Sequence, residues 1–443
     1  MPSQNNASGA KKAISARNIA RAVEALAALD ERRIAKRQRY SIEDPDASND
    51  DADSAAPVLE RFIETRGLDV VHTLTNFTLS ELNTLWANIK TFVSKNWNVG
   101  GGRKCPVTGK DMLFMTLVTL KHAGTWDLIA ATFEEKAATF GKRVTDFVRT
   151  LHQYLVRKYI DEQGLKWTMQ QLVANGLQFQ THKSALYAVD VTFQQTTAPA
   201  VSFGEKKIFF SKKHGLYGHK VEVSVAPNGL AINVTKAYPG SVSDMEIFKE
   251  NLPFHSTQLQ KHHGEAHIED VDPLKDKHPS QWVLLADKGY QGIHEYVRGL
   301  TPTKRPLHGQ LTFEQVAANE RLSSDRVIVE NFFGRLKTLW GLVSNQYSWK
   351  KEEYNIFFQT CVALTNVHIR FNPLRNLDGE GYHQYKNRLI SIGGKIKAKR
   401  EASKAKYRQN RRARIQSALS RTVSGYASED LDLGYDEGNE IFD

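Results

Sequence analysis

The hydrophobic pattern of this chain changes once, near Ser184, and that change constrains the fold more than any other feature. Between about 58 and 160, apolar residues recur at steps of three and four, as in "LSELNTLWANIKTFVSKNW", which predicts helices. After Ser184, "ALYAVDVTF" and "WVLLAD" predict strands, and "HKVEVSVAPNGLAINVTKAY" predicts a hairpin that turns at Asn228-Gly229. The later stretch "DRVIVENFFGRLKTLWGL" is again helical. We therefore expect a helical region followed by a mixed α/β domain.

Three successive helices are predicted behind the glycine-rich basic loop "NVGGGRKCPVTGKD". Thr108 is placed to cap the first helix, with Asp111 as a partner of capping-box type, and that helix should end near Gly124. Thr125 is placed to cap the second, and the third should cover about 142–160. This layout is typical of a helix-turn-helix module that reads DNA, although a plain helical bundle packed on a catalytic domain would give the same pattern.

The net charge of +11 is concentrated in two arms. Residues 11–39 carry nine lysines and arginines against three acids, and residues 395–421 carry eleven against one. Acidic segments at 43–53 and 429–443 contain no basic residue. Basic arms of this density suit nucleic acid or nuclear import, and they are also compatible with solvated helical tails.

Several classes of protein are excluded by what the sequence lacks. No apolar stretch approaches the length of a membrane span, so we expect no membrane association. Cys105 and Cys361 are far apart, which argues against a disulfide framework or a zinc finger and favours a reducing intracellular compartment. His263 and His267 have the spacing of a helical metal pair, but nothing else marks a zinc site, and we interpret the histidine-rich stretch that begins at His255 as a solvated loop.

Three acids lie in or beside apolar segments that should be buried, so they are not readily explained as solvated surface residues. Asp190 lies in the first predicted strand, Asp287 closes the later one, and Glu330 lies in the amphipathic helix beside its apolar stripe. Buried carboxylates that converge repel one another unless divalent cations neutralise them, and such a cluster suits two-metal phosphodiester chemistry. Taken singly, each acid has a structural alternative: Asp190 and Asp287 could serve turns, and Glu330 could pair with Arg326.

The segments "AVDVT", "PGSVSDMEIF", "LLADKGYQG", "TPTKRP" and "RVIVENFFGRLK" follow one another in this order. As a set, they resemble the Harbinger-type transposases of the DDE endonuclease superfamily, over roughly 110–370. The resemblance implies a ribonuclease-H-like fold in which Asp190, Asp287 and Glu330 are catalytic and bind two Mg²⁺ or Mn²⁺ ions. The histidine of the family's "Gly-Ser-x-His-Asp" box is replaced here by Ser243, and we interpret the following Asp244 as a helix cap rather than a further acid in the site.

Basic residues near these acids are candidate contacts to DNA phosphates. They are Lys288, Lys304, Arg305, Arg326, Arg335 and Lys337. Gly289 is expected to let the chain turn away from Asp287, and Tyr290 is expected either to pack in the core or to contact the substrate.

The sequence therefore predicts an α/β protein with a ribonuclease-H-like catalytic domain, an N-terminal helical domain of helix-turn-helix type, and disordered basic and acidic tails. The expected divisions are a disordered arm (1–57), the helical region (58–180), the endonuclease domain (181–375) and a basic helical arm with an acidic tail (376–443). The expected function is that of a nuclear DNA transposase which cleaves and joins DNA at element ends and target. The resemblance suggests a homo-oligomer on DNA and a separate Myb-like DNA-binding partner. The alternatives are a domesticated DNA-binding protein without catalysis and a structure-specific nuclease of the same fold.

Overall fold

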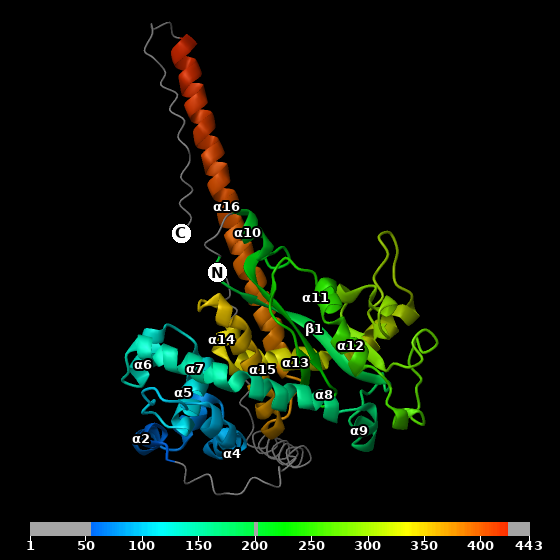
Figure 1. The fold of residues 1–443 in the computed structure, drawn as a ribbon. Helices are drawn as coiled ribbons and strands as arrows, with labels where there is room; N and C mark the ends of the chain where they lie inside the picture. Colours follow the sequence, from blue (N-terminus) through cyan, green and yellow to red (C-terminus); the bar gives the residue numbers. More distant parts are fainter. Residues whose placement is uncertain (1–54, 199–202, 424–443) are drawn as a thin grey trace, which may run out of the picture.

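The computed structural model describes residues 55–198 and 203–423 (Figure 1). The basic segment at 11–39, the acidic segment at 43–53 and the acidic tail at 429–443 lie outside these residues. None of the helices in the described ranges combines the length and the hydrophobicity that crossing a membrane requires.

The described chain begins with the helical region. Its elements are α2 (Pro57–Arg66), α3 (Asp69–Thr75), α4 (Leu79–Asn96), α5 (Gly109–His122), α6 (Trp126–Thr132), α7 (Ala137–Val156), the π-helix η2 (Arg157–Asp161), α8 (Glu162–Lys166) and α9 (Met169–Ala174). Thr108 and Thr125 cap α5 and α6 as predicted, because their hydroxyls accept hydrogen bonds from the amides of Asp111 and Leu128. The third predicted helix begins earlier than expected, at Ala137.

Asp111 has a different role from the predicted capping-box partner. Its carboxylate accepts hydrogen bonds from the backbone amides of Val58 (3.2 Å) and Leu59 (2.9 Å), in the first turn of α2. Two orphan amides of one helix are thus satisfied by the first turn of another. Because α5 is buried along almost its whole length, it forms the centre of the helical region.

A mixed sheet follows the helices. Its strands are β1 (Ala185–Gln195), β2 (Phe210–Ser211), β3 (Leu216–Val225), β4 (Ala231–Val234), β5 (Tyr238–Pro239), β6 (Val283–Ala286) and β7 (Gly299–Leu300). The order is β2-β3-β1-β6-β7, with β4 and β5 also paired to β3. β1 and β3 are antiparallel, whereas β6 and β7 run parallel to β1. The predicted hairpin is confirmed between β3 and β4, and Gly229 takes the positive φ of 86° that its turn requires. This topology is consistent with a ribonuclease-H-like domain.

Helices cover both faces of the sheet (Figure 1). On one face lie α11 (Asp244–Glu250) and α12 (Leu252–Gln258), and on the other lie α13 (Phe313–Leu339), α15 (Tyr354–Phe371) and the first part of α16 (Asp378–Val423). The remaining elements are α10 (Phe203–Ile208), α14 (Gly341–Ser344) and the short 3-10 turns η3 (His263–Glu265), η4 (Lys288–Tyr290), η5 (Ile293–Glu295) and η6 (Lys351–Glu353). The apolar stripe predicted on α13, which runs from Val329 to Leu339, is buried together with the adjoining Trp340.

One hydrophobic core connects the helical region to the α13 face of the sheet. It includes Met115 of α5, Phe147 of α7, Leu285 of β6 and Phe332 of α13. Specific contacts cross the same seam: Trp126 stacks on Trp349, with ring centroids 4.3 Å apart. The helical region and the sheet domain therefore share their interior.

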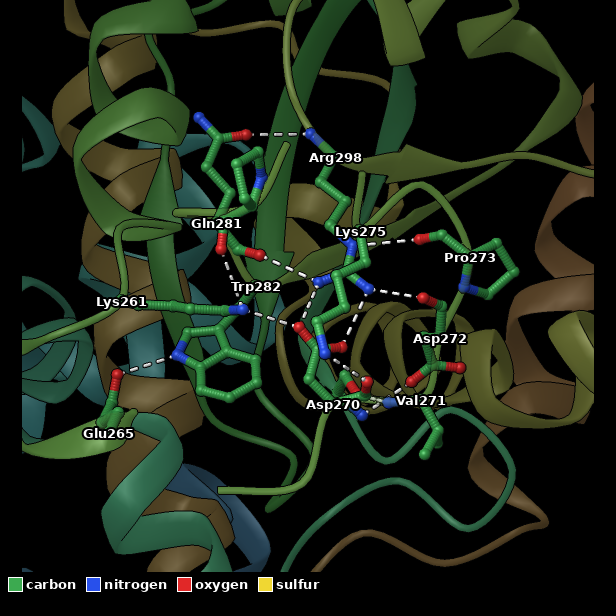
Figure 2. Close-up of polar contacts among 12 residues, drawn as sticks. Lys261, Glu265, Asp270, Val271, Asp272, Pro273, Lys275, Gln281, Trp282 and Arg298 are labelled. Atoms are coloured by element: carbon green, nitrogen blue, oxygen red, sulfur yellow. Dashed lines mark hydrogen bonds and ion pairs between the residues drawn. The ribbon is translucent and has the colours of Figure 1, made fainter. Parts of the chain in front are cut away.

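The stretch between α12 and β6 is anchored rather than freely solvated. Arg298, which is fully buried, pairs with both carboxylate oxygens of Asp270, at 2.7 and 2.8 Å, and donates to the carbonyls of Pro273 and Gln281 (Figure 2). His255 also departs from the predicted solvated loop, since it is fully buried in α12, whereas His263 and His267 are exposed as expected. The buried guanidinium ties this stretch to the start of β7.

Candidate active site

Two of the three predicted acids occupy equivalent positions on neighbouring parallel strands. β1 and β6 pair in parallel, and their last paired residues are Val189 and Ala286. The next residue on each strand is an acid, Asp190 on β1 and Asp287 after β6, so their Cα atoms should lie about 5 Å apart. Since side chains two residues apart share a face, Asp190 and Asp287 point to the same side as Ala188 and Leu285, toward α13.

The third acid, Glu330, comes from α13, which packs against that face of the sheet. Arg326, one turn earlier on the helix, connects it to the strands: the guanidinium lies 3.5 Å from Glu330 Oε1 and 3.5 Å from Asp287 Oδ1. Glu330 also faces α16, where His383 Nε2 lies 3.2 Å from Oε2 and Lys386 Nζ lies 3.9 Å from Oε1. The structure thus brings the three predicted acids into one site, and the predicted Arg326–Glu330 pair is present within it.

The protonation of Asp190 reflects this crowding. Loss of solvation raises the pKa of Asp190 to about 7, and the nearby carboxylates of Asp287 and Asp244 add repulsion, while Arg326 opposes the shift. Any further cation placed beside Asp190 would stabilise the ionised form of its carboxyl group.

The fit of a divalent metal can be judged from the donor set. Among the described residues, no group of three or more His, Cys, Asp or Glu side chains lies in a geometry that would hold a metal ion directly. The donors are nevertheless carboxylates crowded in a poorly solvated site, which are the ligands Mg²⁺ and Mn²⁺ prefer. The guanidinium of Arg326 now lies between Asp287 and Glu330, where a metal ion would bind. Its Nε and Nη1 atoms are buried without a hydrogen-bond partner, so few contacts oppose its displacement. We conclude that the residues fit a divalent cation if Arg326 moves aside.

Asp244 was expected to cap α11, and this was wrong. The N-cap is Ser243, whose hydroxyl accepts from the amide of Glu246 while the Glu246 carboxylate accepts from the amide of Ser243. Asp244 is the first helical residue, and its carboxylate pairs with Lys220 at 3.0 Å on the flank of the site. Both residues are good caps by type, so only the packing of the helix decides between them.

Gly289 also has a different role from the one predicted. It does not adopt a positive φ, whereas Gly292 does, at 89°. A Cβ atom on Gly289 would lie 2.8 Å from Asp244 Oδ2, so a larger residue there would have to displace the Asp244 carboxylate. The turn that carries Asp287 therefore packs directly on the start of α11.

Sequence reasoning missed a buried polar network beneath this turn. Glu222 of β3 is fully buried and accepts from Tyr290 Oη (3.1 Å) and Asn251 Nδ2 (2.9 Å). His255 Nε2 lies 3.1 Å from the same carboxylate, and His255 Nδ1 lies 2.8 Å from Tyr187 Oη. Of the two possibilities for Tyr290, packing in the core is the one observed. Glu222 alternates with apolar residues in its strand, and that was the signal available in the sequence.

The predicted phosphate contacts divide into two groups. Lys288, Lys304 and Arg305 are exposed, as a phosphate contact requires. Arg335 and Lys337 are buried, so their predicted contact with DNA was wrong. Arg335 pairs with Asp378 at 2.7 Å, and Lys337 donates to the carbonyl of Val343 at 2.7 Å. Arg326 lies among the acids, as described above.

Comparison with known families finds a similarity that covers the paired acids. Residues 189–366, from the strand residue before Asp190 to the last part of α15, match the family model described as DDE superfamily endonuclease, so this segment is similar to that superfamily. The match covers less than half of the chain and includes all three acids.

A curated relative points in the same direction. Over 185 residues, the chain is 27% identical to a protein of Microchaete diplosiphon described as a probable transposase for insertion sequence element IS702. The aligned part covers 42% of this chain and 57% of that relative, so the chain spans little more than half of the relative's length. No solved structure matches the chain significantly. The chain is therefore similar over these parts to a DDE endonuclease model and to a probable transposase, and neither comparison points to the Harbinger branch in particular.

Proposed function

We propose that this protein is a DNA transposase that cleaves phosphodiester bonds at element ends and joins the freed 3′-hydroxyl to target DNA. The observation that carries the proposal is the placement of Asp190 and Asp287 at one level of adjacent parallel strands, with Glu330 joined to Asp287 through Arg326. A cluster of carboxylates of this kind has no use in a purely structural core, where it costs stability.

The roles of the residues follow from their positions. Asp190, Asp287 and Glu330 would hold two divalent ions, Mg²⁺ or Mn²⁺, which when bound supply Lewis-acid stabilisation of the attacking and leaving oxygens. The exposed Lys288 follows Asp287 directly and is placed to orient a phosphate beside the acids. Arg326 neutralises the carboxylates until a cation replaces it.

The branch of the transposase family, the location in the cell and the partners are part of the same proposal. The order of the motifs supports a Harbinger-type element and, through that resemblance, a homo-oligomer on DNA and a Myb-like DNA-binding partner. The basic arms support location in the nucleus. Reading of DNA by α5 to α7 is also proposed. Since α5 is buried, the exposed sides of α6 and α7 would have to carry it.

The test is cleavage of a plasmid that carries the DNA flanking this coding sequence, in the presence of Mn²⁺. We expect cleavage by the full chain and its loss in Asp190→Asn, Asp287→Asn and Glu330→Gln. Glu320→Gln, which removes an exposed carboxylate from the same helix, is the matched control and should cleave normally. Wild-type rates in Asp287→Asn or Glu330→Gln would refute the assignment. Cleavage without any joined product would favour a structure-specific nuclease of this fold.

One observation favours a second candidate, a DNA-binding protein without catalysis. Arg326 lies between Asp287 and Glu330, and the described residues hold no ready group of metal ligands. The two candidates differ in their response to a chelator at constant ionic strength. Affinity of a non-catalytic protein for DNA should be unaffected by the chelator, whereas affinity that depends on metal at the acidic site should fall.

A further inference from the structure

The two most exposed large apolar side chains of the described residues lie close together in the chain, immediately before and at the start of α13. Leu307, in the connection from β7 to α13, is 92% exposed, and Phe313, the first residue of α13, is 87% exposed. We define the finger as residues 304–313. Single exposed apolar side chains are common on protein surfaces, so exposure alone does not indicate a contact here; the indication comes from the constrained turn and the cations that accompany these two.

The base of the finger is fixed to the elements that carry the catalytic acids. Gln291, from the turn after Asp287, donates to the hydroxyl of Thr301 (3.1 Å) and to the carbonyl of Pro302 (3.0 Å). The amide of Thr303 donates to the side chain of Asn319 on α13 at 2.8 Å, and Asn319 Nδ2 donates back to the carbonyl of Thr303 at 3.1 Å. The buried Arg298 holds the strand from which the finger emerges (Figure 2).

The tip of the finger is a closed turn. The amide of Gly309 donates to the carbonyl of Pro306 (3.3 Å), which places Leu307 and His308 at the two central positions of the turn. Arg305 Nε donates to the carbonyl of Gly309 at 2.8 Å and braces the turn from one side. Leu307 is therefore presented on a constrained support, which reduces the entropy lost on contact with a partner.

The charge of the finger selects the partner. Lys304 and Arg305 are exposed, and the sequence contains no acid between Glu295 and Glu314. An apolar tip flanked by cations matches the side chains that proteins insert between DNA base steps, where the cations hold the backbone and the apolar group unstacks the bases. On α13, Glu314 directly after Phe313 and Glu320 are both exposed, so the DNA backbone is expected to lie on the side of the finger that carries Lys304 and Arg305 and away from this helix.

The distance to the acidic site follows from helix geometry. Phe313 begins α13, and Glu330 lies 17 residues further along it, which corresponds to about 25 Å at 1.5 Å per residue. Duplex DNA rises about 3.4 Å per base pair, so this separation equals roughly seven base pairs. We infer that the finger is a wedge for duplex DNA, with Leu307 and Phe313 entering a base step roughly seven base pairs from the phosphate held at the acidic site. This inference rests on the proposed function.

The experiment uses the full chain and a series of short nicked duplexes, each with 2-aminopurine at a different distance from the nick. Ca²⁺ is present as a divalent ion in place of Mg²⁺, and the nick represents the cleaved product. We expect the 2-aminopurine fluorescence, which rises when a base unstacks, to increase severalfold at roughly seven base pairs from the nick and at no other position. The double variant Leu307→Ser/Phe313→Ser should abolish the increase and weaken binding roughly tenfold.

The matched control is Leu165→Ser/Val271→Ser, which removes two exposed apolar side chains (78% and 67% exposed) from other surfaces. It should leave both the fluorescence and the affinity unchanged. Tight binding with no increase at any position, or an increase that survives in the finger variant, would overturn the wedge while leaving the proposed function intact. Failure of the wild-type chain to bind any of these duplexes would count against the proposed function itself.

Discussion

Individual charged residues in this protein take one of two roles, and their sequence neighbours do not distinguish them. Glu330 and Lys337 lie seven residues apart on α13, yet Glu330 faces the acidic site while Lys337 lies over the rings of Phe358 and Tyr385 in the interior. Burial lowers the pKa of Lys337 to about 7, because the charged amine is separated from water. The same helix thus carries a candidate catalytic group and a buried structural cation.

The lowered pKa of Lys337 predicts a pH-dependent contribution to stability. The unfolded chain keeps this proton up to about pH 10, whereas the folded chain releases it near pH 7, so its contribution to stability rises with pH between these values. Lys337→Met removes that contribution. We expect the Tm of the variant minus that of the wild type to decrease steadily from pH 7 to pH 10 in thermal unfolding. Lys95→Met, on the surface, should give no such trend, and a flat difference for Lys337→Met would contradict the prediction.

Tyr290 and Glu222 support the turn that carries Asp287. Burial raises the pKa of Tyr290 well above its usual range, so its hydroxyl stays protonated and donates to Glu222. Tyr290→Phe should cost about 1–3 kcal/mol of unfolding free energy, because it leaves a buried carboxylate oxygen without this donor. Urea denaturation measures the loss. Tyr296→Phe, at a half-exposed tyrosine nearby, is the control, and equal stability of the two variants would show that the hydrogen bond has no such effect.

The sequence predicted the positions of the candidate acids correctly, but it did not predict which of the basic residues are buried away from the site. Asp190 and Asp287 could be placed because each ends or interrupts an apolar strand, and parallel pairing then sets them side by side. Arg335 and Lys337 could not, because the groups that bury them, such as Asp378 and Tyr385, come from a helix far along the chain. Ser243 and Asp244 are equally suited to cap a helix, and a shift of one residue is decided by packing.

Among the elements, the contact between α13 and α16 is the one that shapes the site. The two helices approach so closely at Gly334 that a Cβ atom there would lie 1.6 Å from the carbonyl oxygen of Asp378. Arg335 and Asp378 form a buried ion pair at this crossing, and further along α16 His383 and Lys386 reach Glu330. The position of α16 therefore influences the charge around a candidate metal ligand.

The ion pair gives a prediction for this crossing. Asp378→Ala should lower the free energy of unfolding by about 3–5 kcal/mol, because Arg335 is left buried without its counter-ion. It should also make the start of α16 more accessible to limited proteolysis. Glu380→Ala, an exposed acid on the same turn, is the matched control. If the two variants unfolded at the same urea concentration, the pair would not be what holds α16 to α13.

Most helices and strands could be predicted from the pattern of apolar residues, as in α4 and β1. A capping residue also indicated where α5 begins. The packing of α16 was missed although Tyr382, Tyr385, Leu389, Ile392 and Ile396 form an apolar stripe at helical spacing in its first part. The basic residues that follow this stripe dominate the composition of the segment, and they led to its interpretation as a solvated arm. The stretch after α12 was also misjudged, since its anchor, Arg298, lies beyond it in the sequence and acts through Asp270.

On the scale of the whole molecule, α16 projects from the body of the protein (Figure 1). With 46 residues it is about 69 Å long. Side chains from Lys397 to Ser417 are all exposed, and nine of them are lysine or arginine against the single acid Glu401. A helix of this composition gains little from the protein interior and is suited to lie along a polyanion.

Neutralising part of this helix should change how DNA binding responds to salt. Lys404→Gln, Lys406→Gln and Arg408→Gln together should reduce the slope of log affinity against log salt concentration by roughly two to three, if each contacts one phosphate. Binding titrations at several salt concentrations measure it. The triple variant Lys166→Gln/Lys183→Gln/Lys275→Gln removes the same charge from other exposed positions. Equal slopes for the two variants would indicate that only net charge matters.

The interior shared between the helical region and the sheet bears on how such a protein diversifies. Trp126 and Trp349 are more than two hundred positions apart, yet each forms half of one stacked pair. A recombination event that joined the helices of one ancestor to the sheet of another would have to preserve both halves of this and similar contacts. Descendants of such an ancestor should therefore inherit the two regions as a single unit, and diverge by altering surface residues rather than by exchanging segments.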